Sequence, residues 1–121
     1  RYFSSAASDV YKRQLLDGDP KELHKSGAYK EFYMHKIGHW LGLDVHDAGD
    51  YVEGEEYMKF KPGMITTIEP GIYISSSMDV DDKWKGIGIR IEDDILVTKD
   101  GNENLTKKVP SDPEEIESLM S

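Results

Sequence analysis

The stretch that decides the fold is residues 86–98, which read GIGIRIEDDILVT. Its isoleucines at positions 87, 89 and 91 alternate with other residues, and this period of two is typical of a β-strand with one apolar face. The same alternation places Arg90 and Glu92 together on the opposite face. These residues therefore predict a strand that presents two charged side chains on one side.

A second strand-like stretch, residues 64–74, lies upstream and is rich in Ile and Thr. It is interrupted by Glu69–Pro70–Gly71, and Pro and Gly inside such a pattern indicate an edge or a bulge. The polar residues 48–63 and 75–85 on either side predict loops, the first closed by the turn signal Pro62–Gly63.

Two helices are expected, one near each end of the chain. Residues 15–33 predict the first, in which Asp19 can cap the N-terminus, Pro20 suits the first helical position and Glu22 the acidic position of a capping box. Residues 111–120 predict the second, after a turn at residues 100–102. Its capping positions hold Ser111, Pro113 and Glu114.

Composition limits the function. The net charge of −9 argues against nucleic acid and anionic membrane surfaces as partners. No apolar run approaches the roughly 20 residues that span a bilayer. Without cysteine there is no disulfide, thiolate nucleophile or Cys-type zinc site, and a reducing, cytoplasmic location fits. Residues 1–14 show no signal peptide, and Ser5–Gln14 resembles translated adaptor sequence, so we predict that residues 1–14 are a non-native or disordered segment that packs poorly.

Three of the four histidines lie within residues 35–46. His35 and His39 are four apart and would share one face of a helix, as metal ligands do. Gly38 and Gly42 disfavour a long helix there, so strand, turn and loop are expected instead. The cluster is compatible with a metal or catalytic site and equally with hydrogen-bonded loop histidines.

Glu69 and Glu92 lie in apolar surroundings, where an unpaired buried charge is costly. Each is a candidate metal ligand, an ion-pair partner or a solvent-facing edge residue. Together with the histidines they form a ligand set that suits manganese, iron, cobalt or zinc. Asp93 and Asp94 are interpreted as turn or surface groups, and Tyr73 and Trp40 are interpreted as core residues. No phosphate-binding glycine loop or nucleophilic serine elbow is present.

Three blocks resemble the aminopeptidase P family of pita-bread metallopeptidases in their order and spacing. They are HKIGHWLGLDVHDAG from residue 35, TTIEPGIYI from residue 66 and GIGIRIEDDILVT from residue 86. The resemblance implies an α+β fold, here a partial pita-bread fold with a curved antiparallel sheet and flanking helices. Residues 15–121 would form the C-terminal part of the catalytic domain.

The resemblance also implies roles for individual residues. His39, Glu69 and Glu92 match metal ligands of a site for two divalent ions, usually manganese. His35 and His46 match histidines that line the proline pocket and act in catalysis. Two further matches, Arg90 in catalysis and Tyr73 in the substrate pocket, complete the set.

Two departures from the family pattern bear on activity. Lys36 stands where the family commonly has glycine. Two aspartate ligands of the family have no counterpart in residues 1–14 and are expected upstream of Leu15. The chain thus carries three of five ligands and is expected to be inactive alone.

The expected function is metal-dependent release of the N-terminal residue from peptides with proline in second position. One alternative is prolidase, which shares the fold and ligands but cleaves dipeptides. Another is a non-catalytic pita-bread module that binds peptides or partners. The intact enzyme is expected to bind such peptides, with no nucleic acid or membrane partner, and homo-oligomerisation is an open expectation.

Overall fold

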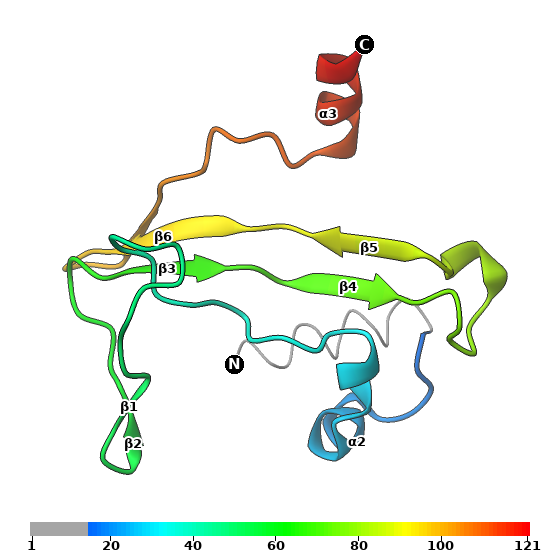
Figure 1. The fold of residues 1–121 in the computed structure, drawn as a ribbon, viewed down its shortest axis with the longest axis horizontal. Coiled ribbons are helices and arrows are strands. Elements are labelled where there is room, and N and C mark those ends of the chain that lie inside the picture. The colour runs from blue at the N-terminus through cyan, green and yellow to red at the C-terminus, as the bar shows by residue number, and fades with distance from the viewer. Residues whose placement is uncertain (1–14) are drawn as a thin grey trace. The chain divides into compact units, whose positions relative to one another are not determined.

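The computed structural model describes residues 15–121, drawn in colour in Figure 1. They belong to two compact units. The first unit combines the chain up to Ile37 with Pro70–Arg90. The second combines Gly38–Glu69 with Ile91–Ser121. None of the helices in the described residues is long and apolar enough to cross a membrane.

The first unit contains an antiparallel pair of strands, β4 (Gly71–Ile74) and β5 (Ile87–Arg90), visible in Figure 1. The same unit holds the helix α2 (Pro20–Ser26), which packs on the 3-10 helix η1 (Ala28–Glu31). The main-chain N–H of Tyr73 in β4 donates to the carbonyl of Phe32 at 2.8 Å. Beneath this contact lies an apolar core built from Leu15, Phe32 and Ile74.

The first helix starts as predicted but ends early. Asp19 caps it and accepts from the N–H groups of Lys21 and Glu22 at 2.9 and 3.2 Å. Gly27 adopts φ 77°, a left-handed conformation that ends α-helices. The prediction of one helix over residues 15–33 was therefore wrong in its length. Similarly, the predicted loop 75–85 contains a short 3-10 helix, η2 (Asp82–Trp84).

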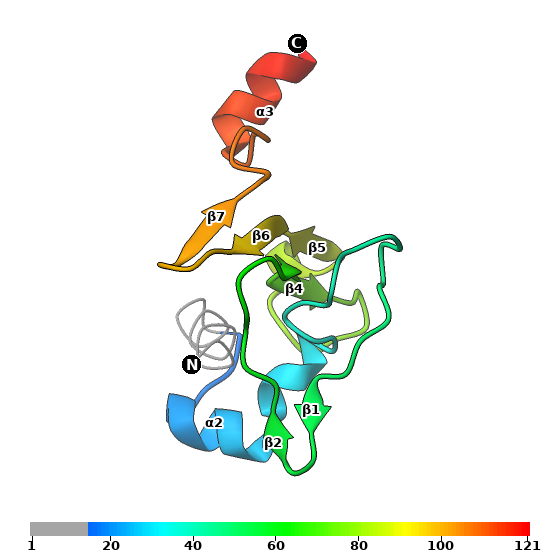
Figure 2. The ribbon, with the colours of Figure 1, turned by 90° about the vertical axis from the view of Figure 1, so that its left-hand side faces the viewer.

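The second unit contains a three-stranded antiparallel sheet in the order β3-β6-β7. Its strands are β3 (Ile65–Ile68), β6 (Asp93–Val97) and β7 (Asn102–Asn104). The predicted turn at residues 100–102 connects β6 to β7, as Figure 2 shows from the side. The antiparallel sheet expected from the sequence is therefore present in this unit.

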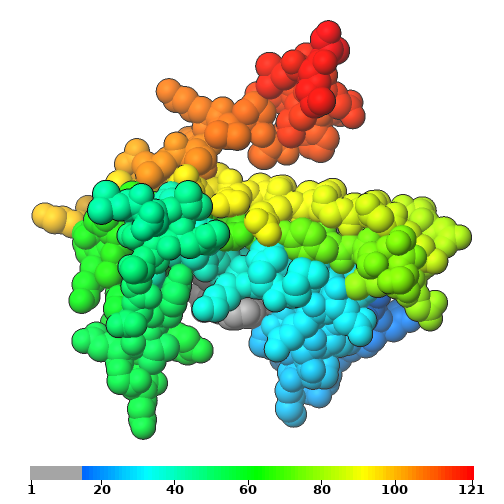
Figure 3. Space-filling view, viewed as in Figure 1, coloured from blue at the N-terminus to red at the C-terminus, as the bar shows by residue number. Residues whose placement is uncertain are grey.

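Two other parts of the second unit differ from prediction. The expected loop 48–63 contains a small hairpin, β1 (Val52–Glu53) and β2 (Glu56–Tyr57), which turns at Gly54 with φ 67° (Figure 2). The last helix, α3 (Pro113–Met120), is capped by Asp112 instead of Ser111. Helix α3 has no buried residue, and Figure 3 shows its side chains open to view.

The predicted strand 86–98 is divided in two, and this corrects three expectations. β5 ends at Arg90 and pairs with β4, whereas β6 begins at Asp93 and pairs with β3. Pro70 explains the division, because it has no N–H to continue a ladder between Ile68 and Gly71. Arg90 and Glu92 therefore do not share the face of one strand. Asp93 and its neighbour at position 94 lie half-buried in β6, not in a turn.

The apolar face expected for that strand is largely open. Ile89 and Ile91 are 59% and 51% exposed to solvent. The alternation of isoleucines thus identified strand conformation correctly, but the burial that it implied is not found.

Candidate metal centre

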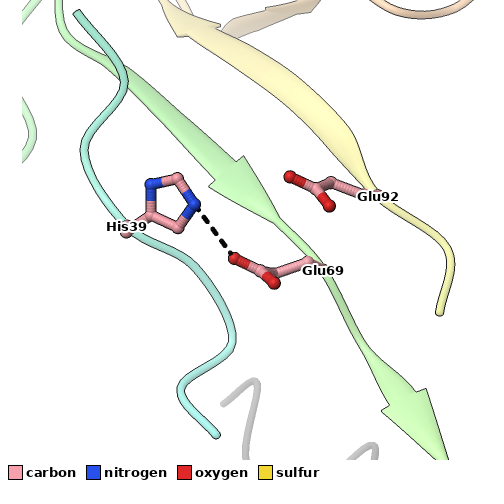
Figure 4. Close-up of side chains that lie close together, drawn as sticks. All are labelled: His39, Glu69 and Glu92. Atoms are coloured by element: carbon pink, nitrogen blue, oxygen red, sulfur yellow. Dashed lines mark ion pairs between the residues drawn. The ribbon is translucent and has the colours of Figure 1, made fainter. Parts of the chain in front are cut away.

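The three predicted ligands converge in the second unit (Figure 4). His39 lies in the loop before β1, Glu69 directly follows β3, and Glu92 directly precedes β6. One ligand atom from each lies within 4.8 Å of the others. Glu69 is buried, His39 is half-buried and Glu92 is exposed, so the cluster runs from the interior of the unit to its surface.

Main-chain hydrogen bonds hold the His39 loop alongside β3. The N–H of Thr67 donates to the carbonyl of His39 at 2.9 Å, and the N–H of Leu41 donates to the carbonyl of Ile65 at 3.1 Å. Gly38 permits this approach, because a Cβ there would stand 2.0 Å from the Thr67 carbonyl oxygen. The glycine that argued against a helix is needed for close packing of the loop on the strand.

The hydrogen bonds of His39 determine which ring nitrogen faces the cluster. Nδ1 lies 3.0 Å from the carbonyl oxygen of Trp40, which only accepts, so Nδ1 carries a proton and donates. In the neutral ring Nε2 then holds a lone pair, and it lies 3.3 Å from Oε1 of Glu69. Two facing lone pairs repel, so this geometry suits a proton or a metal ion between the two atoms.

Several features of this donor set fit a divalent metal. A metal-ligating imidazole commonly donates its other N–H to a backbone carbonyl, as His39 does to Trp40. One imidazole and two carboxylates suit manganese, iron, cobalt or zinc. The ion-pair alternative for Glu69 has the same geometry, because a proton at Nε2 of His39 gives an ion pair.

His46 lies beside this cluster. Its ring centroid is 4.4 Å from that of His39, with the rings at 62° to one another.

Trp40, expected in the core, is only half-buried. It stacks on Tyr51 at 5.5 Å and donates from its indole nitrogen to the carbonyl of Asp50.

The other predicted site residues form a second cluster, in the first unit. Oη of Tyr73 lies 2.7 Å from Nε of Arg90 and 2.9 Å from Nε2 of His35. Nδ1 of His35 lies 2.7 Å from the carbonyl oxygen of Lys36. The structure thus groups the site residues as His39, His46, Glu69 and Glu92 in one unit and His35, Tyr73 and Arg90 in the other.

The direction of this second network follows from its ends. Arg90 only donates and the Lys36 carbonyl only accepts, so Arg90 donates to Tyr73, Tyr73 to His35, and His35 to Lys36. The neutral His35 ring is therefore protonated at Nδ1. Lys36, which departs from the family pattern, supplies its main-chain oxygen to this network, and a glycine would supply the same atom.

Reasoning from sequence missed Thr67. Its hydroxyl donates to Oε1 of Glu69 at 3.0 Å and accepts from the main-chain N–H of His39 at 3.0 Å. A signal was available, because residues two apart in extended chain point to the same side. Thr67 stands two residues before Glu69.

Comparisons with known proteins agree with this arrangement. Residues 4–99 match the model of metallopeptidase family M24. The chain is 50% identical over 113 residues to Xaa-Pro aminopeptidase of Escherichia coli, covering 93% of this chain and 25% of that protein. It is also 50% identical over 107 residues to the Haemophilus influenzae enzyme, covering 88% and 25%. The chain thus spans about a quarter of the length of these relatives.

Solved structures give the same result for the fold. A Pseudomonas aeruginosa aminopeptidase superposes with a TM-score of 0.92 at 50% identity, covering 98% of this chain and 27% of that one. Aminopeptidase P from E. coli with the inhibitor Pro-Leu gives 0.87 at 49% identity, with the same coverage.

These matches establish the expected fold class, α+β with the antiparallel sheets of a partial pita-bread fold. The family match begins at residue 4, inside the stretch interpreted as foreign. That interpretation stays a prediction, and the expected poor packing of residues 1–14 falls outside the described residues. By its sequence, its fold and its histidine–carboxylate cluster, the chain belongs to metallopeptidase family M24.

Proposed function

We propose that this protein acts as a metal-dependent aminopeptidase that releases the N-terminal residue from peptides with proline in second position. The observation that carries the proposal is the convergence of His39, Glu69 and Glu92 within 4.8 Å. It occurs in a chain that is 50% identical in sequence to the Xaa-Pro aminopeptidases of two bacteria.

The metal would be held by Nε2 of His39 and the carboxylates of Glu69 and Glu92. Two divalent ions are proposed for the complete site, with manganese as the first candidate. A zinc-substituted structure of E. coli aminopeptidase P in complex with product is among the structural neighbours. Divalent ions in such a site polarise the scissile carbonyl and activate water as the nucleophile.

The chain's own residues supply the proton-handling groups. Glu69, buried and oriented by Thr67, would hold the proton released from the attacking water. His46 lies beside His39 and His35 is oriented by Tyr73, so both imidazoles have fixed neighbours. Imidazole suits proton transfer and hydrogen bonding to a developing negative charge at neutral pH.

The substrate preference rests on the chemistry of the Xaa-Pro bond. Proline has a fixed φ and no N–H, so a peptidase that binds its substrate through that N–H is unable to use it. A site that recognises the ring itself is required, and in the first unit His35 and Tyr73 are the proposed lining residues.

We further propose that the 121-residue chain alone is a poor catalyst. A dinuclear centre holds its ions about 3.5–4 Å apart with ligands that fix both, and the described residues bring only three predicted ligands together. A lone ion can be held by three protein ligands, so weak binding is expected, with tripeptide cleavage at background level.

A chimera tests the proposed activity. In E. coli Xaa-Pro aminopeptidase, the matching quarter would be replaced by residues of this chain, and the product assayed with manganese. Three substrates would be compared: a tripeptide with proline second, the same tripeptide with alanine second, and an Xaa-Pro dipeptide.

We expect the chimera to cleave the tripeptide with proline second and neither of the other two substrates. His39→Ala should abolish this cleavage. Activity confined to the dipeptide would indicate prolidase. A folded chimera that binds manganese and the tripeptide without cleaving it would refute the enzyme proposal and indicate a binding module.

A further inference from the structure

The hydroxyl of Thr67 connects two of the proposed metal ligands. Thr67 is 1% exposed, so this hydroxyl is inaccessible to solvent. Its oxygen accepts from the main-chain N–H of His39 and its proton goes to Oε1 of Glu69, both at 3.0 Å. A hydroxyl offers one donor and two acceptor positions, so it makes both bonds at once.

The same carboxylate oxygen also faces the other ligand. Oε1 of Glu69 lies 3.3 Å from Nε2 of His39. The same oxygen thus accepts from the Thr67 hydroxyl and lies close to Nε2 of His39. In this way the hydroxyl orients the carboxylate and the histidine main chain with respect to one another.

We propose that Thr67 is a positioning residue for the metal site: it acts through Glu69 and His39 to set their separation before a metal binds. This inference rests on the proposed metal site. Thr67 itself touches no metal, and its contribution is the hydrogen bond to Glu69, not its volume.

The adjacent Thr66 provides a matched control. It is also buried in β3, at 7% exposure, and is the same residue type. Its hydroxyl donates to the main-chain oxygens of His39 and Thr67. Replacing either threonine with valine removes one buried hydroxyl from the same strand, but only one of these hydroxyls bonds the Glu69 carboxylate.

The test is the affinity of the full chain for Co²⁺ alone, measured by calorimetry and by the visible absorption of the bound ion. Thr67→Val should weaken binding by about 10-fold or more, since partners that orient metal ligands are worth about 10–100-fold in affinity. Thr67→Ser should retain affinity and spectrum, and Thr66→Val, which leaves the bond to the Glu69 carboxylate intact, should have a much smaller effect than Thr67→Val. If Thr67→Val does not fold, Thr67→Ala removes the same hydroxyl without overfilling the site.

A double-mutant comparison tests whether Thr67 acts through the carboxylate. In a Glu69→Gln background, Thr67→Val should have a much smaller effect on Co²⁺ affinity than in the wild type. Equal effects in the two backgrounds would overturn the proposal.

Two further outcomes separate this inference from the proposed metal site. Co²⁺ binding that His39→Ala abolishes but Thr67→Val leaves intact would overturn the role of Thr67 and leave the site standing. Equal binding by the wild type and His39→Ala would overturn the site, and the inference with it. A serine variant as weak as the valine variant would show that the hydroxyl is not the group that matters.

Discussion

Replacing Gly38 with alanine tests how closely the His39 loop must approach β3. The added Cβ would lie 2.0 Å from the carbonyl oxygen of Thr67 and 2.9 Å from its carbonyl carbon. Both are main-chain atoms, so no side-chain rotation relieves the overlap. The methyl group and the oxygen must separate by about 1.4 Å to reach the 3.4 Å of ordinary contact.

That displacement acts on two hydrogen bonds. The N–H of Thr67 donates to the His39 carbonyl at 2.9 Å, and the N–H of His39 donates to the Thr67 hydroxyl at 3.0 Å. Each is worth about 1 kcal/mol net, and forcing an extra carbon into a packed site costs about 1–3 kcal/mol. The expected loss is about 3–5 kcal/mol, a large fraction of the roughly 5–15 kcal/mol that stabilises a domain.

Urea denaturation followed by far-UV circular dichroism measures this loss. Gly101→Ala is the control, because nothing lies within 4 Å of its added Cβ, and a change within about 0.5 kcal/mol is expected there. A loss below about 1 kcal/mol for Gly38→Ala, at unchanged denaturant slope, would refute the close approach. Co²⁺ affinity should fall with stability, since the same movement separates His39 from Glu69.

Three other predictions concern local structure. Asp112→Ala should cost α3 about 1 kcal/mol, because Asp112 accepts from the first N–H groups of the helix, and circular dichroism at 222 nm should show reduced helicity. Neutral His35 should be protonated at Nδ1, and a nitrogen NMR signal for an Nε2–H ring would contradict the direction of the Tyr73 network. The pKa of the Asp81 carboxyl lies below its usual value because the Lys83 side chain, and then its main-chain N–H, donate to it. Asp81 therefore contributes stability above the unfolded pKa that is lost as pH falls through the lowered folded value, and an NMR titration of Lys83→Gln should show this pKa move upward.

Much of the local structure could be predicted because its causes are local. Asp19 caps α2 as predicted, since a cap depends on a side chain and the two or three N–H groups that follow it. The break at Glu69–Pro70 was readable because proline lacks a ladder donor wherever it stands. The isoleucine alternation also identified extended chain, because the period of two is a property of the strand itself.

Errors arose where a distant partner decides the outcome. Residues 86–98 read as one strand, but their division depends on which strand lies opposite, and that strand is interrupted at Pro70. The length of the first helix depended on Gly27, whose left-handed φ is compatible with its sequence but not dictated by it.

For the candidate site, residue types and their order made Glu69, Glu92 and the histidine cluster candidates, and the family resemblance selected His39, Glu69 and Glu92 among them. Sequence also supplied the family resemblance that named His35, His46, Arg90 and Tyr73. None of this specified which nitrogen of His39 faces Glu69, because that follows from a carbonyl at Trp40.

The sequence by itself determined the family, the kinds of candidate ligand and the positions of most helix and strand signals, because these depend on residue identity and spacing. Only the tertiary structure decided that Gly38 lets the His39 loop meet β3 and that Thr67 bonds His39 and Glu69 at once. Both depend on segments about 28 residues apart lying side by side, and the cost of bringing such segments together is met by packing that no local pattern encodes.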